Sequence, residues 1–265
     1  MPELPEVEQF RRYFDSTSLN RTVEGVRVRD SRILRGCSGS SLGRALHGKT
    51  FRSSLRRGKY LIAETDGEWQ VILHFGMTGS LHFSPSRSPD PTGAVVTFRF
   101  ADGSSLAYIS QRLLGQVRLT RQWETERAIA TLGPEPLDPE FSLAAFSIRL
   151  RSRNARIKTL LMNQRFVAGI GNLYSDEILF QSQLHPLQKA SDLTHLQIKR
   201  LYRATRRVLH LAVARNADAR RFPRHYLFPH RDIGSLCPRC KSPLASLRMT
   251  GRTAIFCPHC QPLLC

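Results

Sequence analysis

The chain has 265 residues with 41% hydrophobic side chains, enough for one large domain or two modest ones, each with its own core. No apolar run approaches the roughly 20 residues of a membrane-spanning helix, and the acidic N-terminus lacks a signal-peptide core, so we expect an intracellular protein without a membrane partner. The net charge of +19 favours a polyanionic partner.

The first residues predict a reactive amine at the start of a helix. Once the initiator methionine is removed, the nitrogen of Pro2 is a free secondary amine, which can attack an aldehyde-like carbon to give an iminium. Pro5 suits a first helical turn, and Glu6 suits the positive end of the helix. The apolar side chains then share one helical face: Val7, Phe10 and Phe14. From these residues alone, an ordinary N-terminus remains the alternative.

Residues 22 to about 120 predict an antiparallel β-structure. The apolar or alternating segments are Thr22–Asp30, Lys59–Thr65, Trp69–Phe75, Ala94–Phe100 and Leu106–Ser110. Asp66-Gly67 and Asp102-Gly103 separate pairs of these segments, as hairpin turns do. Several short strands at this spacing predict a sandwich or a barrel.

A proline-rich stretch and a helical region follow. Residues 133–142 contain three prolines and are interpreted as a linker between a domain of residues 1–132 and a helical domain of residues 143–232. The helices predicted beyond the linker are Leu143–Leu150, Arg156–Met162, Leu173–Gln181 and Leu196–Ala214. Thr194 and Gln197 have capping-box spacing at the start of the last helix.

The positive charge is concentrated in the C-terminal part of the chain. Residues 151–265 hold 20 Lys and Arg against 5 Asp and Glu, whereas residues 1–150 hold 20 against 16. Such a concentration is typical of a protein that binds nucleic acid, and no long amphipathic helix stands alone at either end to favour a membrane surface. A basic surface without a specific partner is the alternative.

Four cysteines predict a structural metal site in a C-terminal zinc finger, residues 233–265. Cys237 and Cys240 are followed, after 16 residues, by Cys257 and Cys260, which is strong zinc-site spacing. Four thiolates leave no open coordination position, so we expect one structural Zn²⁺. Disulfides are disfavoured because nothing in the sequence indicates an oxidising compartment.

Three loops carry residues suited to DNA contact. Gly171 and Asn172 lie in a Gly-Ile-Gly-Asn turn before a helix, where backbone N–H groups and the helix N-terminus favour a phosphate. His74 and Met77 follow a strand, and an exposed Met on a loop can wedge into a base stack. Arg252, on the hairpin between the cysteine pairs, can place a guanidinium on a phosphate. Ordinary turn, core and surface roles are the alternatives.

The order of these pieces resembles the formamidopyrimidine-DNA glycosylase / endonuclease VIII family, from residue 2 to residue 261. The motifs are Pro2-Glu3-Leu4-Pro5-Glu6-Val7-Glu8, His74-Phe75-Gly76-Met77-Thr78-Gly79, Val167-Ala168-Gly169-Ile170-Gly171-Asn172-Leu173-Tyr174 and the closing Cys257-Pro258-His259-Cys260-Gln261. Leu4 resembles the formamidopyrimidine branch, because endonuclease VIII proteins usually have Gly there. The resemblance implies an α+β fold, with an N-terminal helix on an antiparallel β-sandwich, then a helix-two-turn-helix domain and a zinc finger.

The resemblance also implies a mechanism. A monomer would bind double-stranded DNA with oxidised bases or abasic sites in a cleft between two lobes and flip the damaged nucleotide out. Pro2 would attack C1′ of its sugar, expel the base and leave an iminium. Glu3 would protonate the opening sugar, and Glu6 would support the site. Successive β- and δ-eliminations would then cut both flanking phosphodiester bonds, so this base-excision repair enzyme of the bacterial cytoplasm would be both glycosylase and abasic-site lyase.

Matching positions receive further roles by the same resemblance. Lys59 would join the catalytic set near the lesion phosphates. The phosphate clamp would consist of Lys158, His74, Asn172 and Arg252. Gly171 would make room for the DNA backbone, and Met77 would fill the gap left by the flipped nucleotide. Arg112 would face the orphaned partner base, and Leu114 would wedge beside it.

Two departures from the family pattern bear on the lesion. Leu114 is aliphatic where the family loop Asp-Pro-Arg-Arg-Phe-Gly usually has an aromatic wedge. Residues 216–235 are shorter than the Gly-rich loop, or lid, that closes over 8-oxoguanine in the family, so we expect 8-oxoguanine to be a weak substrate. A non-catalytic zinc-ribbon protein that binds damaged DNA on this scaffold is the alternative, and the intact Pro2-Glu3 pair favours the enzyme.

Overall fold

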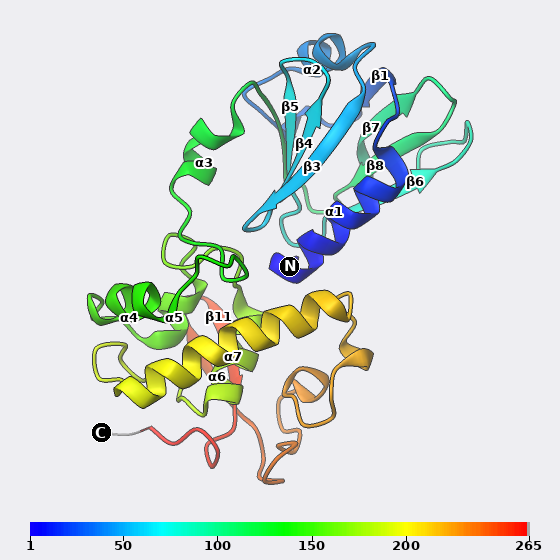
Figure 1. Ribbon diagram of the computed structural model, residues 1–265. Helices are drawn as coiled ribbons and strands as arrows, with labels where there is room; N and C mark the ends of the chain where they lie inside the picture. Colours follow the sequence, from blue (N-terminus) through cyan, green and yellow to red (C-terminus); the bar gives the residue numbers. More distant parts are fainter. Residues whose placement is uncertain (264–265) are drawn as a thin grey trace. The chain divides into compact units, whose positions relative to one another are not determined.

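The computed structural model describes residues 1–263, and these form two compact units that divide between Thr131 and Leu132 (Figure 1). The last two residues of the expected zinc-finger range, 264–265, lie outside the described residues. No helix within residues 1–263 is long and apolar enough to cross a membrane.

Unit 1 opens with the predicted N-terminal helix, α1 (Leu4–Ser18). Val7 and Phe14 are buried and Phe10 is partly buried against the same core, which confirms the predicted apolar face. The Phe10 ring packs on Phe75 with centroids 4.3 Å apart. Burying a side chain of this size contributes about 1.5–3 kcal/mol, so packing on the sheet holds α1 in place.

Two sheets form most of the rest of unit 1, and their buried faces supply the main core. The first has the order β1-β7-β8-β6, with strands Val23–Val28, Ala94–Phe100, Ser105–Ile109 and Ser80–Ser84. The second has the order β2-β9-β5-β4-β3, with strands Leu34–Arg35, Gln116–Thr120, Gln70–His74, Tyr60–Thr65 and Phe51–Arg57. Neighbours are antiparallel except β2 and β9. The predicted β-sandwich is confirmed.

Several elements of unit 1 are not predicted by the sequence pattern. Only Phe51 of β3 is buried, so this strand shows no alternation of apolar side chains. The helix α2 (Gly39–Leu46) is short and rich in Gly and Ser, and Ser38 caps its first turn. The remaining short elements are η1 (Ser31–Ile33), η2 (Trp123–Thr125) and α3 (Arg127–Ala130).

Unit 2 is built on four helices that match the four predicted ones. They are α4 (Leu143–Arg151), α5 (Ile157–Met162), α6 (Asn172–Ser182) and α7 (His195–Ala214). One face of α7 is buried from Ile198 to Ala212, and the predicted capping box of Thr194 and Gln197 is formed. The helix α6 is buried on almost every side, polar residues included, so it forms the centre of the unit.

The proline-rich segment 133–142 is packed along the helices of unit 2. The Gly133 N–H donates to the Gln164 carbonyl at 2.8 Å. Phe141 is buried, and its carbonyl accepts a hydrogen bond from the Tyr202 hydroxyl at 2.6 Å. A stretch that the sequence predicts as a linker therefore adds apolar and hydrogen-bonded contacts to this unit.

The C-terminal part of unit 2 holds a compact segment and a hairpin. Residues 216–235 contain two short turns of helix, η3 (Ala219–Arg221) and η4 (Phe228–His230). The hairpin strands are β10 (Ala245–Met249) and β11 (Arg252–Phe256). Phe180 of α6 and Leu227 pack with the buried cysteines of the hairpin, so the finger shares a core with the helices.

Residues 216–235 are anchored on α6 by a buried carboxylate and stacked rings. Glu177 Oε2 accepts the Phe228 N–H at 2.7 Å, and the Phe228 ring stacks on Tyr174 and Phe222 at 5.7 and 4.5 Å. Burial raises the pKa of Glu177 to about 7, although hydrogen bonds from Gln181 and the backbone and the charge of Arg239 oppose the shift.

This raised pKa predicts a pH dependence of stability. The folded state holds the Glu177 proton up to about pH 7, whereas the unfolded chain releases it near its ordinary pKa of 4.5. Stability therefore falls as pH rises between these values, by up to about 3 kcal/mol. We expect the melting temperature of wild type to fall relative to that of Glu177→Gln between pH 5 and pH 8, because only wild type must release the buried proton. A difference in melting temperature that stays the same at both pH values would contradict the assignment.

Candidate active site and nucleic-acid interface

The chain N-terminus is held by its own first helical turn. Pro2 is half-buried, and Glu3 is 2% exposed. The Glu3 N–H donates to Glu6 Oε2 at 2.8 Å, so Glu6 satisfies a backbone donor at the positive end of α1. Glu6 therefore fixes the path of the backbone that carries Pro2 and Glu3.

An ion pair and a hydrogen bond, both made by Arg56, connect α1 to the turn that carries Lys59. Glu8 Oε2 lies 3.4 Å from Arg56 Nε, and an Arg56 Nη donates to the Gly58 carbonyl at 3.2 Å. Burial opposes ionisation of Glu8, but its arginine partners Arg11 and Arg56 outweigh that effect and lower its pKa. Lys59, the next residue, is 7% exposed. Sequence reasoning missed Glu8 and Arg56 in this role; the only local signal is Glu8 in the N-terminal motif.

His74 lies at the end of β5 as a neutral hydrogen-bond donor. Its ring packs on Tyr60 at 4.8 Å, and its Nδ1 accepts the Gly76 N–H at 3.4 Å. Burial, helped by the charge of Lys59, lowers the pKa of His74 to about 4. With Nδ1 used as an acceptor, the ring carries its hydrogen on Nε2 at neutral pH.

The loops 74–79 and 110–115 are locked together by backbone contact. A Cβ on Gly76, whose φ is +59°, would lie 2.4 Å from the carbonyl carbon of Leu114. A Cβ on Gly115 would lie 1.8 Å from the Tyr108 hydroxyl, which donates to the His74 carbonyl at 2.9 Å. Only glycine fits at either position, so each loop fixes the other.

These two loops present the predicted base-contacting side chains to the surface. Met77 is 45% exposed and Leu114 is 48% exposed, and Arg112 is exposed as well. Leu113, which lies between Arg112 and Leu114 in the sequence, has a left-handed φ of 51° and packs against the core of unit 1. The loop thus keeps one leucine inside and holds its two neighbours outside. The structure brings His74, Met77, Arg112 and Leu114 together in unit 1.

The predicted phosphate residues of unit 2 surround the start of α6. Gly171 is the N-cap residue, Asn172 begins the helix, and Asn172 Nδ2 donates to the Thr253 carbonyl of β11 at 3.0 Å. An amide nitrogen carries two hydrogens, so one remains for a second acceptor. Arg252 is exposed at the start of β11, with a Nη 3.8 Å from Met162 Sδ.

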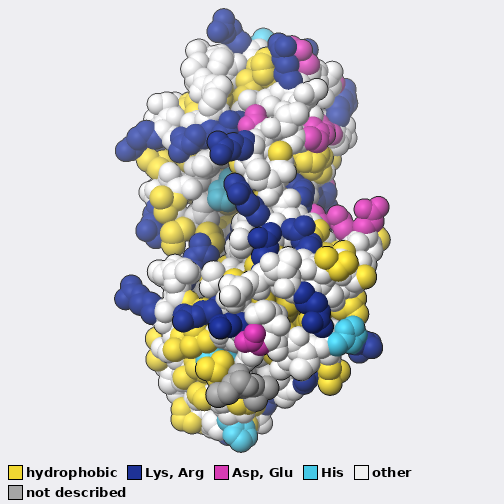
Figure 2. Space-filling model, turned by 90° about the vertical axis from the view of Figure 1, so that its left-hand side faces the viewer, with side chains coloured by type: hydrophobic (Ala, Val, Ile, Leu, Met, Phe, Trp, Pro, Cys, Tyr) yellow, Lys and Arg dark blue, Asp and Glu magenta, His cyan; other side chains and the backbone are white. Residues whose placement is uncertain are grey.

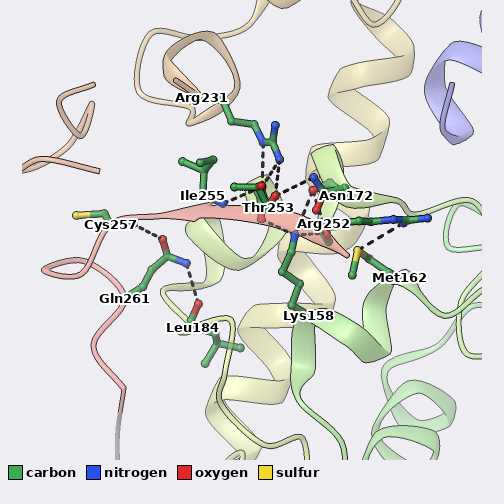
Figure 3. Close-up of polar contacts among 12 residues, drawn as sticks. Lys158, Met162, Asn172, Leu184, Arg231, Arg252, Thr253, Ile255, Cys257 and Gln261 are labelled. Atoms are coloured by element: carbon green, nitrogen blue, oxygen red, sulfur yellow. Dashed lines mark hydrogen bonds and ion pairs between the residues drawn. The ribbon is translucent and has the colours of Figure 1, made fainter. Parts of the chain in front are cut away.

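Lys158, which the resemblance assigns to the phosphate clamp, lies inside unit 2. Its side chain is fully buried, and Nζ donates to the Asn172 carbonyl, Ser175 Oγ and Asp176 Oδ1 (Figure 3). The ammonium thus supports the start of α6 from inside the protein. Sequence reasoning did not single out Asp176 as its partner.

A hollow lies beside Asn172 and Arg252 on unit 2. Its lining is Asn172, Arg231, Asp232, Ile233, Arg252, Thr253 and Ile255. Arg231 enters from residues 216–235 and is directed at the edge of β11 in Figure 3. Figure 2 shows more Lys and Arg than Asp and Glu side chains on the face that it draws, in agreement with the net charge of +19.

The four predicted cysteine ligands come together at the base of the hairpin. Their sulfur atoms all lie within 4.8 Å of one another, with Cys237–Cys260 at 3.9 Å and Cys240–Cys257 at 3.4 Å. Tetrahedral zinc with Zn–S bonds of about 2.3 Å has sulfurs about 3.8 Å apart. The cluster is close enough to hold one metal ion, and its all-thiolate chemistry fits Zn²⁺.

Two family models match the chain. The formamidopyrimidine-DNA glycosylase N-terminal domain matches residues 1–117, and the formamidopyrimidine-DNA glycosylase H2TH domain matches residues 132–223. With the cysteine hairpin, these domains define a DNA-repair glycosylase, and they confirm the predicted helix-two-turn-helix.

Relatives extend the match to almost the whole chain. A formamidopyrimidine-DNA glycosylase of Desulfitobacterium hafniense is 35% identical over 274 residues, 98% of this chain and 100% of that protein. The chain therefore belongs to the formamidopyrimidine-DNA glycosylase family. The crystal structure of the Lactococcus lactis enzyme bound to abasic-site DNA has a TM-score of 0.90 and 28% identity, covering 98% of this chain and 99% of that one. The structure of the same enzyme with DNA that contains N7-benzyl-Fapy-dG has a TM-score of 0.89 and 28% identity, and the match covers 98% of this chain and 100% of that one.

Proposed function

We propose that the protein is a bifunctional glycosylase and abasic-site lyase of base-excision repair, acting as a monomer on chromosomal DNA in the cytoplasm. Its substrate is double-stranded DNA with oxidised or ring-opened bases or abasic sites. The observation that carries the proposal is Pro2, placed directly before a helix and a buried Glu3, in a family of DNA glycosylases. The solved relatives with abasic-site and Fapy-dG DNA support this substrate class.

The chemistry proposed for this site begins with the Pro2 nitrogen. The positive end of α1 disfavours a charge on the amine, so its lone pair is available to attack C1′ of the damaged nucleotide. The C1′–base bond breaks with protonation of the departing base, and Glu3 protonates O4′ as the sugar opens. The resulting iminium acidifies the C2′ hydrogen. Loss of that proton expels the 3′ phosphate, and a second elimination expels the 5′ phosphate.

The remaining predicted residues are assigned to DNA. Lys59 and the neutral His74 act near the lesion phosphates, while Asn172 and Arg252 hold phosphates on unit 2. Gly171 makes room for the DNA backbone. Met77, Arg112 and Leu114 act on the vacated base stack and the partner base, because they are exposed on two loops of fixed geometry. Lys158 contributes by holding the start of α6 beneath these contacts.

Zinc fits the cysteine cluster, with Cys237, Cys240, Cys257 and Cys260 as ligands. A closed four-thiolate site supplies folding free energy and no reactive coordination position. The zinc finger therefore serves to hold the hairpin that carries Arg252.

Borohydride trapping separates this enzyme from a non-catalytic binder. An abasic-site duplex and the reductant are expected to give a covalent adduct with wild-type protein, because borohydride reduces the iminium to a stable amine. A protein that bound the duplex tightly and gave no adduct would instead be the damaged-DNA binder.

The anchored segment 216–235 supports a substrate range without efficient 8-oxoguanine removal. Phe222, Tyr226 and Leu227 are buried. Phe228 stacks on Tyr174 of α6 and Leu227 packs with Phe180, so the segment does not form a long loop that closes over an extruded base. Leu114 supplies less stacking area than an aromatic wedge would. Ring-opened purines, hydantoins or oxidised pyrimidines are therefore the favoured substrates.

Single-turnover cleavage tests this preference. We expect a hydantoin opposite C to be excised at least about tenfold faster than 8-oxoguanine opposite C, because selection depends on contacts with the flipped base. An abasic-site duplex, cleaved without base selection, serves as the control for intact lyase chemistry. Equal or faster removal of 8-oxoguanine would overturn the preference and leave the proposed chemistry in place.

A further inference from the structure

Five residues of unit 2, with the buried Asp176 among them, form a closed ring of hydrogen bonds, called here the Asp176 ring. Its members are Lys158, Asn172, Asp176, Arg231 and Thr253 (Figure 3). Asp176 Oδ1 accepts from Lys158 Nζ at 2.5 Å, and Oδ2 accepts from Arg231 Nε at 2.9 Å and an Arg231 Nη at 2.5 Å. Arg231 and Asn172 both donate to the Thr253 carbonyl, and Lys158 donates to the Asn172 carbonyl, which closes the ring.

The Asp176 ring joins four separate parts of the unit: α5, α6, β11 and residues 216–235. Asp176 is 1% exposed and also accepts the Ile255 N–H of β11 at 3.1 Å. Both carboxylate oxygens are therefore used, each by a different cation. Charge-assisted hydrogen bonds are short and directional, so they fix the spacing of these parts more closely than apolar packing does.

The ring controls two side chains that it places next to the hollow. Asn172 is a member, and Arg252 directly precedes the member Thr253 on β11. A shift of β11 along α6 changes the separation of the Asn172 amide and the Arg252 guanidinium. A phosphate contact requires both donors to be set before DNA arrives, because ordering them on binding costs affinity.

We propose that Asp176 and Arg231 are positioning residues for the phosphate site of unit 2. Arg231 donates to a carbonyl of β11, and the buried Lys158 donates to a carbonyl at the start of α6. Asp176 accepts hydrogen bonds from both cations and so connects the two elements. The segment 216–235, shorter than the family lid, thereby gains a task in DNA binding through Arg231. This inference rests on the proposed phosphate contacts of Asn172 and Arg252.

A purely electrostatic effect and a positioning role predict opposite changes in DNA affinity when Asp176 is replaced. Asp176→Asn removes a negative charge near DNA, so Coulomb attraction alone predicts tighter binding. Loss of the ring predicts weaker binding. Because Asp176→Asn leaves the buried Lys158 without its partner and can unfold the unit, Arg231→Lys is the main test. It keeps the charge and removes the two-pronged contact of the guanidinium.

The experiment measures affinity for a short duplex that contains a stable tetrahydrofuran abasic-site analogue, over a range of salt concentrations. We expect Arg231→Lys to bind about tenfold more weakly, with a log–log salt slope smaller by about one phosphate contact. In an Arg252→Gln background, Arg231→Lys is expected to cost only about twofold, because the neutral Asn172 amide is then the one remaining donor that the ring positions. The control is Arg215→Lys, because Arg215 is exposed at the end of α7 and is not a member of the ring. Zinc content and melting temperature establish that each variant is folded.

The outcomes separate the two proposals. Unchanged affinity of Arg231→Lys, while Arg252→Gln weakens binding, overturns the inference alone. An equal loss from Arg231→Lys in both backgrounds also overturns it, because Arg231 then contacts DNA independently. No effect of Arg252→Gln removes the proposed phosphate contact and the inference together. Tighter binding by folded Asp176→Asn overturns the positioning role of Asp176.

Discussion

Replacing Pro2 with glycine is expected to slow base excision by at least about 10³-fold, because the proposed nucleophile of the reaction is changed. Glycine still offers an α-amine, but it lacks the secondary nitrogen and the ring that fixes the backbone before α1. Single-turnover excision from a duplex with an oxidised base measures the loss. Borohydride trapping on an abasic-site duplex, where no base must be expelled, measures what the new amine retains.

The matched control for this substitution is Pro5→Ala. Pro5 is a buried proline three residues away, in the first turn of α1, and it supplies no amine to the reaction. We expect this variant to keep most of the trapping and excision, since alanine is a good helix former. A Pro2→Gly protein that excised bases at the wild-type rate would remove Pro2 from the catalytic step.

The second large effect, on DNA binding, is expected from loss of the proposed zinc ligands. Cys257→Ser, or removal of metal with a chelator, is expected to weaken DNA binding at least about 100-fold, because structural zinc contributes about 10–16 kcal/mol of apparent folding free energy in isolated fingers. The buried cysteines share their core with Phe180 and Leu227, so the damage extends to the contact between the hairpin and α6. Metal content and DNA titration on the full chain measure both consequences.

Cys37→Ser serves as the matched thiol control. Cys37 is partly buried in unit 1 and lies outside the cysteine cluster, so this variant is expected to keep its metal and its affinity. Retention of zinc and of full DNA affinity by Cys257→Ser would show that Cys257 is not a structural ligand. Loss of metal without loss of affinity would separate the finger from DNA binding.

Local patterns made much of the fold predictable. The helices α4 and α7 carry side-chain caps at Ser142 and Thr194, α7 has an apolar stripe, and the cysteine pairs have the spacing of metal ligands. The strand β3 lacks such a signal, because its place depends on pairing with β4 rather than on buried side chains of its own.

The site is less predictable, because its contacts join distant residues. The partners of Asp176 are Lys158, Arg231 and Ile255, at sequence separations of 18, 55 and 79 residues. Full burial of Lys158 runs against the ordinary exposure of lysine, and its contacts with Asp176 and Asn172 leave no local signal in the sequence. The sequence motifs select candidate residues, whereas the tertiary contacts decide whether each side chain is exposed or supports a neighbouring residue.

The backbone contact between loops 74–79 and 110–115 has a consequence for grafting these loops from one family member to another. Gly76 and Gly115 leave no room for a Cβ, so the two loops form a single interchangeable cassette. Installing an aromatic wedge at Leu114 together with a foreign 110–115 loop requires the matching 74–79 loop as well. We therefore expect Met77 and Leu114 to be exchanged together in such a graft, and a graft of both loops to be the way to test their proposed part in damage recognition.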